Sequence, residues 1–198
     1  MEILKLFQYT EKLKFSYIEK ALNVRSNKLA YHLKNLTKKG IISKEGNYYK
    51  LSESSEYIIP YLSGKESYLP VVLILIGDNK KAFLYLRKKR PYHNLLSLPG
   101  GRMLMGESLE TASKRMMKEK FNINIRFEKL NSISFEQVKK AGKDIHSFIL
   151  FFVTATTRDN IKLTDVEENE NKIISSDYKL IKKDSNKEMK INTICSKI

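Results

Sequence analysis

The chain has 198 residues, and 41% of them are hydrophobic, which is the composition of a folded protein and excludes a disordered one. This length predicts one large or two small domains, and two are expected. The single cysteine, Cys195, excludes an internal disulfide framework and fits a reducing compartment. Apolar runs such as 71–76 and 148–153 are too short to span a bilayer and no signal-peptide pattern is present, so we expect a cytoplasmic protein with no membrane partner.

The chain is strongly basic, with a formal net charge of +15 and a pI of about 9.7. Residues 1–65 carry 12 Lys or Arg against 6 Asp or Glu (+6), and residues 66–198 carry 25 against 16 (+9). Such a balance favours polyanionic partners, either nucleic-acid phosphates or a phosphorylated ligand. The alternative is a Lys-rich solvated surface that reflects only the base composition of the genome.

The N-terminal residues predict three helices followed by a β-hairpin. Apolar residues have helical spacing over residues 2–10, a capping-box pattern opens a second helix at Ser16, and Ser26 is a suitable N-cap for a third. That third helix carries a stripe of leucines and ends at Gly40. A hairpin is expected over 41–51, with its turn at 45–47.

This order resembles the winged helix-turn-helix of ArsR/MarR-type regulators, in which a His-Leu-Lys-x-Leu helix precedes a Gly-Ile-Ile strand. Here these are His32-Leu33-Lys34-Asn35-Leu36 and Gly40-Ile41-Ile42. The resemblance implies that residues 1–65 bind double-stranded DNA, and that the chain is a homodimer reading two half-sites. The alternative is a protein-docking module. The residues expected at base edges are Ser26, Asn27, Lys28, Tyr31 and His32, and those expected at phosphates are Lys34, Lys38, Lys44 and Lys50.

A second domain, 66–198, is expected after a short helix at 52–64 that Pro60 interrupts. It opens with strands at 71–76 and 82–88, and a helix from Ser108 to about Phe121 follows a glycine-bearing loop. Further strands are predicted at 123–127, 131–137, 144–156 and 173–176, with a terminal helix at 186–197.

The stretch Leu98–Ile123 reads LPGGRMLMGESLETASKRMMKEKFNI and resembles the Nudix box, G-x5-E-x7-R-E-U-x-E-E-x-G-U, where U is aliphatic. The resemblance implies a Nudix α/β/α sandwich over about 70–198, so the fold class is α+β followed by α/β: a winged helix-turn-helix and then the sandwich. The family positions that this chain retains are Gly101, Glu107, Arg115, Glu119 and Ile123.

Three other family positions differ, because Met116 and Lys120 replace glutamates and Asn122 replaces a glycine. In Nudix hydrolases three helix carboxylates bind Mg²⁺ or Mn²⁺ around a diphosphate, since positions i, i+3 and i+4 share one helix face. The formal charge of that face changes here from −3 to −1 + 1 = 0. Glu119 is left as the candidate catalytic carboxylate, and with the Gly101 carbonyl it predicts at most weak binding of Mg²⁺ or Mn²⁺.

Lys120 is instead suited to pair with the phosphates of a ligand. Glu107 and Arg115 are expected to form a structural ion pair between loop and helix. The acidic segment 165–170 is either a solvated loop or the source of a further metal ligand. The candidate ligand-binding residues, including aromatic and basic side chains of the loop before the box, are Arg87, Arg90, Tyr92, His93, Gly100, Gly101 and Lys120.

The leading hypothesis is a DNA-binding transcriptional regulator whose Nudix domain binds a nucleotide-type small molecule with little or no hydrolysis. The family resemblance implies a nucleoside-diphosphate-linked metabolite such as ADP-ribose. The alternative is an active, metal-dependent Nudix pyrophosphohydrolase with an accessory winged helix. A third hypothesis is a nucleic-acid-associated scaffold with neither ligand nor catalysis.

Overall fold

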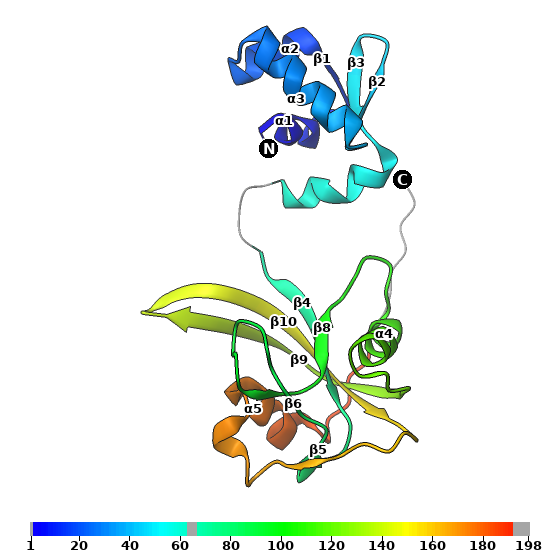
Figure 1. The fold of residues 1–198 in the computed structure, drawn as a ribbon, viewed down its shortest axis with the longest axis vertical. Coiled ribbons are helices and arrows are strands. Elements are labelled where there is room, and N and C mark those ends of the chain that lie inside the picture. Colours follow the sequence, from blue (N-terminus) through cyan, green and yellow to red (C-terminus); the bar gives the residue numbers. More distant parts are fainter. Residues whose placement is uncertain (1, 63–66, 192–198) are drawn as a thin grey trace. The chain divides into compact units, whose positions relative to one another are not determined.

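The computed structural model describes residues 2–62 and 67–191 and divides into two compact units, 1–66 and 67–198 (Figure 1). No helix in these described ranges has the length and apolar character needed to cross a membrane.

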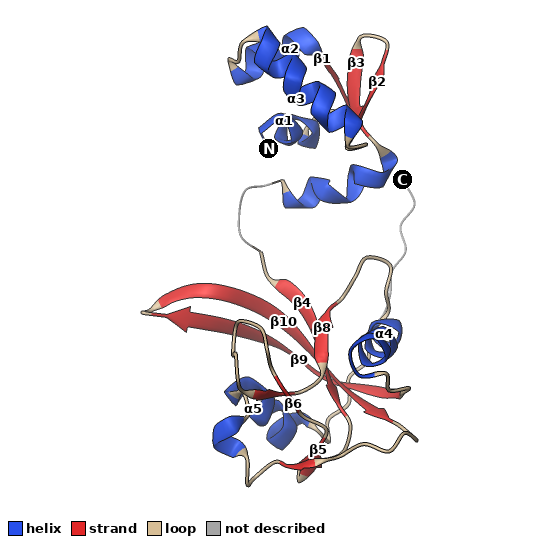
Figure 2. Cartoon of the chain, in the orientation of Figure 1, coloured by secondary structure: helices blue, strands red, loops and turns tan. Residues whose placement is uncertain are grey.

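The N-terminal unit combines short helices with a three-stranded antiparallel sheet, ordered β1-β3-β2 (Figure 2). The predicted third helix and the hairpin are confirmed, whereas strand β1 was not foreseen. The elements in chain order are α1 (Glu2–Lys5), the 3-10 helix η1 (Leu6–Gln8), β1 (Lys12–Lys14), α2 (Phe15–Leu22), α3 (Ser26–Lys38), β2 (Ile42–Glu45), β3 (Tyr48–Leu51) and the 3-10 helix η2 (Glu53–Tyr61).

The core of this unit forms because each element contributes a few apolar side chains to one cluster. Leu29 and Leu33 are buried beneath α3, one turn apart, and Ile18 of α2 packs against them. The two predicted serine caps are wrong. Helix α2 already begins at Phe15, so Ser16 lies inside it, and Ser26 lies inside α3, where its hydroxyl donates to the Glu19 carboxylate.

The C-terminal unit is built on a four-stranded mixed sheet in the order β8-β4-β10-β9. Strand β4 (Leu69–Leu75) runs parallel to β10 (Lys143–Thr156) and antiparallel to β8 (Gly100–Arg102), while β9 (Arg126–Lys140) pairs antiparallel with β10. The remaining elements are the strand pairs β5 (Lys81–Ala82) with β11 (Thr164–Asp165) and β6 (Tyr85–Leu86) with β7 (Leu96–Ser97), the helices α4 (Leu109–Phe121) and α5 (Ser175–Asp184), and the 3-10 helix η3 (Glu170–Lys172).

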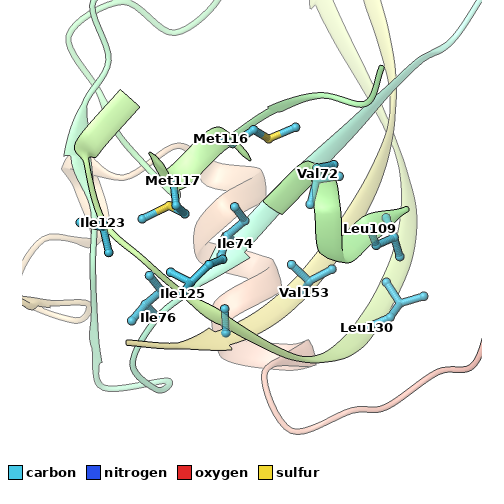
Figure 3. Packing of buried hydrophobic residues seen from close by; sticks show 12 residues of the cluster. Val72, Ile74, Ile76, Leu109, Met116, Met117, Ile123, Ile125, Leu130 and Val153 are labelled. Carbon is cyan, nitrogen blue, oxygen red and sulfur yellow. The ribbon is translucent and has the colours of Figure 1, made fainter. Parts of the chain in front are cut away.

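Alternating residues of β4 face two separate cores, as the period of two along a strand requires. Val72 and Ile74 pack with Met116 and Met117 of α4 (Figure 3). Leu73 and Leu75 pack on the other face with a cluster that includes Leu180 and Ile181 of α5. A helix therefore covers each face of the sheet, which is a mixed α/β arrangement.

Four predictions for this unit are wrong, and the first error comes from a strand pairing between residues distant in sequence. The two strands expected at 123–127 and 131–137 are one strand, β9, because β10 pairs along its whole length. The strand expected at 82–88 is interrupted between β5 and β6. The segment 173–176 leads into helix α5 instead of forming a strand, and residues 186–191 of the expected terminal helix are not helical; 192–197 lie outside the described residues.

Helix α4 ends on a left-handed residue, Asn122, at φ 55° and ψ 31°. The Asn122 N–H donates to the Lys118 carbonyl at 3.0 Å. Asparagine, like the glycine of the family pattern, tolerates the left-handed conformation at this position. We expect Asn122→Gly to leave stability within a few tenths of a kcal/mol and Asn122→Val to cost about 1–2 kcal/mol, because a β-branched side chain is disfavoured at positive φ. Urea denaturation of the three proteins measures both values. Equal losses in the two variants would show that the Asn122 side chain, and not its backbone conformation, matters.

Candidate functional site

The loop before α4 is held tightly against the sheet. A Cβ atom on Gly100 would lie 2.2 Å from the Val72 carbonyl oxygen, so only glycine permits this approach of β8 to β4. The Ile74 N–H also donates to the Pro99 carbonyl at 2.8 Å. The backbone of the Pro99-Gly100-Gly101 turn is therefore fixed relative to the sheet.

An ion pair fixes the other end of the loop to the helix. The guanidinium of Arg115 donates to both carboxylate oxygens of Glu107, with Nη2 to Oε2 at 2.9 Å, and Nη2 also reaches the Arg102 carbonyl at 3.2 Å. Glu107 further accepts the Leu104 N–H at 2.8 Å. Hydrogen bonding to Arg115 lowers the pKa of the Glu107 carboxyl to about 2, so this pair stays ionised at neutral pH.

Three positions of α4 carry carboxylates in the family pattern, and in this chain their side chains lie in three different environments. Met116 is 1% exposed and belongs to the core between α4 and the sheet. Glu119 is exposed and contacts Arg115 Nη1 at 3.3 Å. Lys120 turns toward the loop, where its Nζ donates to the Gly100 carbonyl. A cation thus occupies the space between helix and loop.

Lys120 is an exposed residue, but its contact with the Gly100 carbonyl is partly buried, and the charges that act on its ammonium are mostly positive. Burial, and then the charges of Arg87, Lys89 and Arg115, lower the pKa of Lys120, while Glu119 opposes them. A hydrogen bond to one neutral carbonyl does not neutralise this ammonium. The arrangement is consequently an anion-attracting one.

The residues present do not fit a Mg²⁺ or Mn²⁺ site. These ions require several oxygen ligands in a compact set, and the three family positions of α4 hold one carboxylate, Glu119, with a thioether (Met116) and an ammonium (Lys120) at the other two. No group of three or more His, Cys, Asp or Glu side chains gathers within residues 2–62 and 67–191.

The loop before the box is organised by Arg87. Its Nε donates to the carbonyls of Lys89 at 3.1 Å and Pro91 at 2.7 Å. Tyr92 has a positive φ of 66° and donates its hydroxyl to Glu136 Oε1 at 3.0 Å. Burial and the Glu136 charge raise the pKa of Tyr92. The loop therefore brings Arg87 near Lys120 and Tyr92 near Glu136.

The other two residues predicted in this loop, Arg90 and His93, are exposed. Neither makes a hydrogen bond or ion pair within the described parts of the chain. Lys89 was not among the predicted ligand-binding residues, although it lies in the basic run Arg87-Lys88-Lys89-Arg90 of the sequence.

A buried acid that the sequence did not indicate lies beside this loop. Asp177 in the first turn of α5 is 3% exposed, and its Oδ2 accepts the Leu98 N–H at 2.8 Å and the Ser97 hydroxyl at 3.0 Å. Burial raises the pKa of Asp177 to about 7, and the hydrogen bonds from Leu98 and Ser97 offset this only in part. Asp177 joins α5 to the residue before Pro99, and so supports the box from the opposite face of the sheet.

The acidic segment 165–170 is engaged in local structure. Asp165 Oδ1 accepts the N–H groups of Glu167 and Glu168, each at 3.0 Å, and Glu167 pairs with Lys182 at 2.7 Å. Two of the four carboxylates of the segment, those of Asp165 and Glu167, are therefore engaged in local contacts.

In the N-terminal unit, the outer face of α3 presents most of the residues predicted to contact DNA. Ser26 is exposed but bonded to Glu19, and the Tyr31 and His32 rings meet edge to face at 5.6 Å. The exposed residues of this face are Asn27, Lys28, Tyr31, His32, Lys34 and Lys38.

The hairpin lysines differ in their contacts. Lys44 lies over the Tyr49 ring at 5.8 Å and is exposed. Lys50 pairs with Glu45, which also binds Lys12 at 3.3 Å. Among the described residues no carboxylate pairs with Lys44, whereas Lys50 pairs with Glu45.

Comparison with known proteins gives one family and a set of distant structures. The model of the family described as NUDIX domain matches residues 67–184. A NUDIX hydrolase from Nitrosomonas europaea is 17% identical, with 58% of this chain and 84% of that chain covered and a TM-score of 0.47. The NUDIX domain of Shewanella oneidensis NrtR complexed with ADP ribose is 18% identical, with 66% and 95% covered and a TM-score of 0.46. Shewanella oneidensis NrtR complexed with a 27mer DNA is 19% identical, with 56% and 57% covered and a TM-score of 0.43. No curated protein matches the chain.

Asp177 predicts a distinctive pH dependence of stability. Its pKa is about 7 in the folded state against an ordinary value of 3.8, so between these values the folded protein holds a proton that the unfolded chain releases. The free energy of unfolding should therefore fall as pH rises from about 4 to about 7, by up to about 4 kcal/mol for this difference of about three units. Asp177→Asn retains an acceptor for Leu98 and should flatten this dependence, as measured by urea unfolding across the pH range.

The matched control for this experiment is Asp144→Asn, which removes an exposed carboxylate. The lowered pKa of Glu107 acts in a different window, because its contribution is lost only as pH falls below about 4.5. If Asp177→Asn and wild type lose stability in parallel between pH 4 and 7, the assigned protonation of Asp177 is wrong.

Proposed function

The chain belongs to the NUDIX domain family, and from this membership we propose that it is a DNA-binding transcriptional regulator whose Nudix unit binds a nucleotide-type metabolite with little or no hydrolysis. The ligand is a nucleoside-diphosphate-linked compound resembling ADP-ribose. The N-terminal unit is a winged helix-turn-helix, and the protein acts as a homodimer on double-stranded DNA.

The observation that carries the ligand proposal is the contact of Lys120 with the Gly100 carbonyl. In the family this space belongs to a metal ion held by carboxylates. Here an ammonium lies in it, beside Arg87, Lys89 and Arg115. Phosphate oxygens accept charge-assisted hydrogen bonds from such groups without an intervening cation. Diphosphate binding is thereby supported, and metal-dependent activation of water is not.

The N-terminal proposal is supported by element order and by charge. The order α1-β1-α2-α3-β2-β3, with a β1-β3-β2 sheet, resembles that of a winged helix and supports the proposal. The face of α3 that points away from the core carries Lys28, Lys34 and Lys38 together with amide, imidazole and phenol groups. A helix of this kind fits the major groove, where its polar side chains contact base edges.

Lys120→Glu tests the ligand site. Replacing the ammonium by a carboxylate removes a charge-assisted contact worth roughly 1.5–3 kcal/mol, so affinity should fall at least about tenfold. We expect this loss in calorimetric titration of ADP-ribose in the presence of EDTA. Lys118→Glu makes the same charge change at an exposed position of α4 and should leave the affinity nearly unchanged.

The result that contradicts a metal-independent site is easily recognised. It is Mg²⁺- or Mn²⁺-dependent turnover of ADP-ribose above about 1 s⁻¹ that Glu119→Ala abolishes and Lys120→Glu does not impair. The protein would then be a Nudix pyrophosphohydrolase with an accessory N-terminal unit.

Lys34→Ala and Lys44→Ala test the DNA surface. Each removes one exposed cation, so each should reduce the slope of log affinity against log salt concentration by about one. The measurement is fluorescence anisotropy with a labelled duplex over a salt series. Lys162→Ala, an exposed lysine of the C-terminal unit, serves as the control. Unchanged slopes in both N-terminal variants would mean that this unit does not dock on DNA.

A further inference from the structure

The β9–β10 hairpin continues well past the sheet to which it belongs. Strand β4 pairs with β10 only from Phe148 onward, whereas β9 and β10 pair as far as Lys140 and Lys143. Residues 137–147, here called the ribbon, therefore form a two-stranded extension with which no third strand of the described residues pairs (Figure 1). None of its side chains is buried.

The tip of the ribbon is not built for stability. A two-stranded ribbon without an apolar face is marginal in water. Its last pair places Lys140 directly opposite Lys143, and like charges in such a pair destabilise a hairpin. The turn places Ala141 at φ 50°, in the left-handed region that a residue with a Cβ disfavours. The stability of the hairpin therefore does not explain why Lys140, Ala141 and Lys143 occupy its tip.

The charge of the tip identifies the class of its partner. Lys139, Lys140 and Lys143 are exposed and Asp144 is the one acid in the ribbon, so the net charge is 3 − 1 = +2. Asp144 lies 3.7 Å from Lys139, which leaves Lys140 and Lys143 uncompensated by it. Two adjacent ammonium groups on a narrow projecting ribbon match the phosphates of a nucleic-acid backbone.

We infer that the tip of this ribbon is a second DNA-contacting element, located in the Nudix unit, that binds backbone phosphates through Lys140 and Lys143. Binding of an anion between the two lysines relieves their repulsion, so the contact compensates for the cost of the pair. Because phosphate contacts carry no sequence information, the ribbon adds affinity and salt dependence but no base preference. The inference rests on the proposed function in that the partner is the same kind of duplex.

The test uses the full chain with the double substitution K140Q/K143Q and a mixed-sequence duplex several helical turns long. We expect the slope of log affinity against log salt to fall by about two, since each phosphate contact contributes about 0.9. K162Q/K172Q removes two exposed lysines from the same unit and should leave the slope unchanged. The thermal midpoint of K140Q/K143Q should not fall, because the substitution removes a repulsive pair.

The outcomes separate this inference from the proposed function. An unchanged slope in K140Q/K143Q, with a reduced slope in Lys34→Ala, overturns the ribbon contact and leaves the regulator standing. The reverse result supports the ribbon and removes DNA binding by the N-terminal unit. A marked fall in the thermal midpoint of K140Q/K143Q would show that the lysines are structural and would overturn the inference.

Discussion

At Gly100 the backbone of β8 approaches β4 so closely that a Cβ atom would meet the Val72 carbonyl oxygen at 2.2 Å. This approach fixes the direction of the Gly100 carbonyl, which accepts from Lys120. The Glu107–Arg115 pair fixes the other end of the same loop, and Asp177 holds the Leu98 N–H in front of it. The loop carbonyl that accepts from the Lys120 ammonium is therefore held in place by backbone contacts, by an ion pair and by a buried acid.

The two altered positions of the box depend on one another. A carboxylate at Lys120 would face the Gly100 carbonyl oxygen, and two oxygens at hydrogen-bonding distance repel unless a cation lies between them. A carboxylate at Met116 would enter the core between α4 and the sheet, where an unpaired charge is costly. In a metal-binding box, a bound ion lies between the two facing oxygens and also neutralises the carboxylates. In this chain the Lys120 ammonium donates to the Gly100 carbonyl, and the Met116 thioether fills the core between α4 and the sheet.

Local signals in the sequence were sufficient for the elements that depend on them. Helix α3 follows its leucine spacing, and α4 follows the Ser108 cap and ends at Asn122, so both helices were predicted close to their observed bounds. Strand β9 was predicted as two separate strands and helix α5 was not predicted, because pairing with β10 and the hydrogen bonds of Asp177 involve residues far away in the chain. For the same reason, the resemblance to the box indicated which residues replace glutamates but not that Lys120 reaches Gly100. The partner of Asp177, Ser97, is 80 residues away, and no spacing rule connects the two.

An ammonium and a divalent ion are not equivalent beside a diphosphate. The divalent ion neutralises phosphate charge and also acidifies a bound water, which supplies the nucleophile for hydrolysis. The Lys120 ammonium has three donors and no site at which a water is activated in this way, so it performs only the first task. It is also covalently attached, and its charge is present whether or not Mg²⁺ is available. On the proposed function, the separation of charge neutralisation from water activation explains why the framework of the box is retained. Gly100, Glu107 and Arg115 still shape a loop that receives phosphates. The hydrolysis that would consume the ligand has lost its source of hydroxide. A ligand that persists after binding is what a regulator requires, because occupancy then reports the concentration of the metabolite instead of the rate at which it is destroyed.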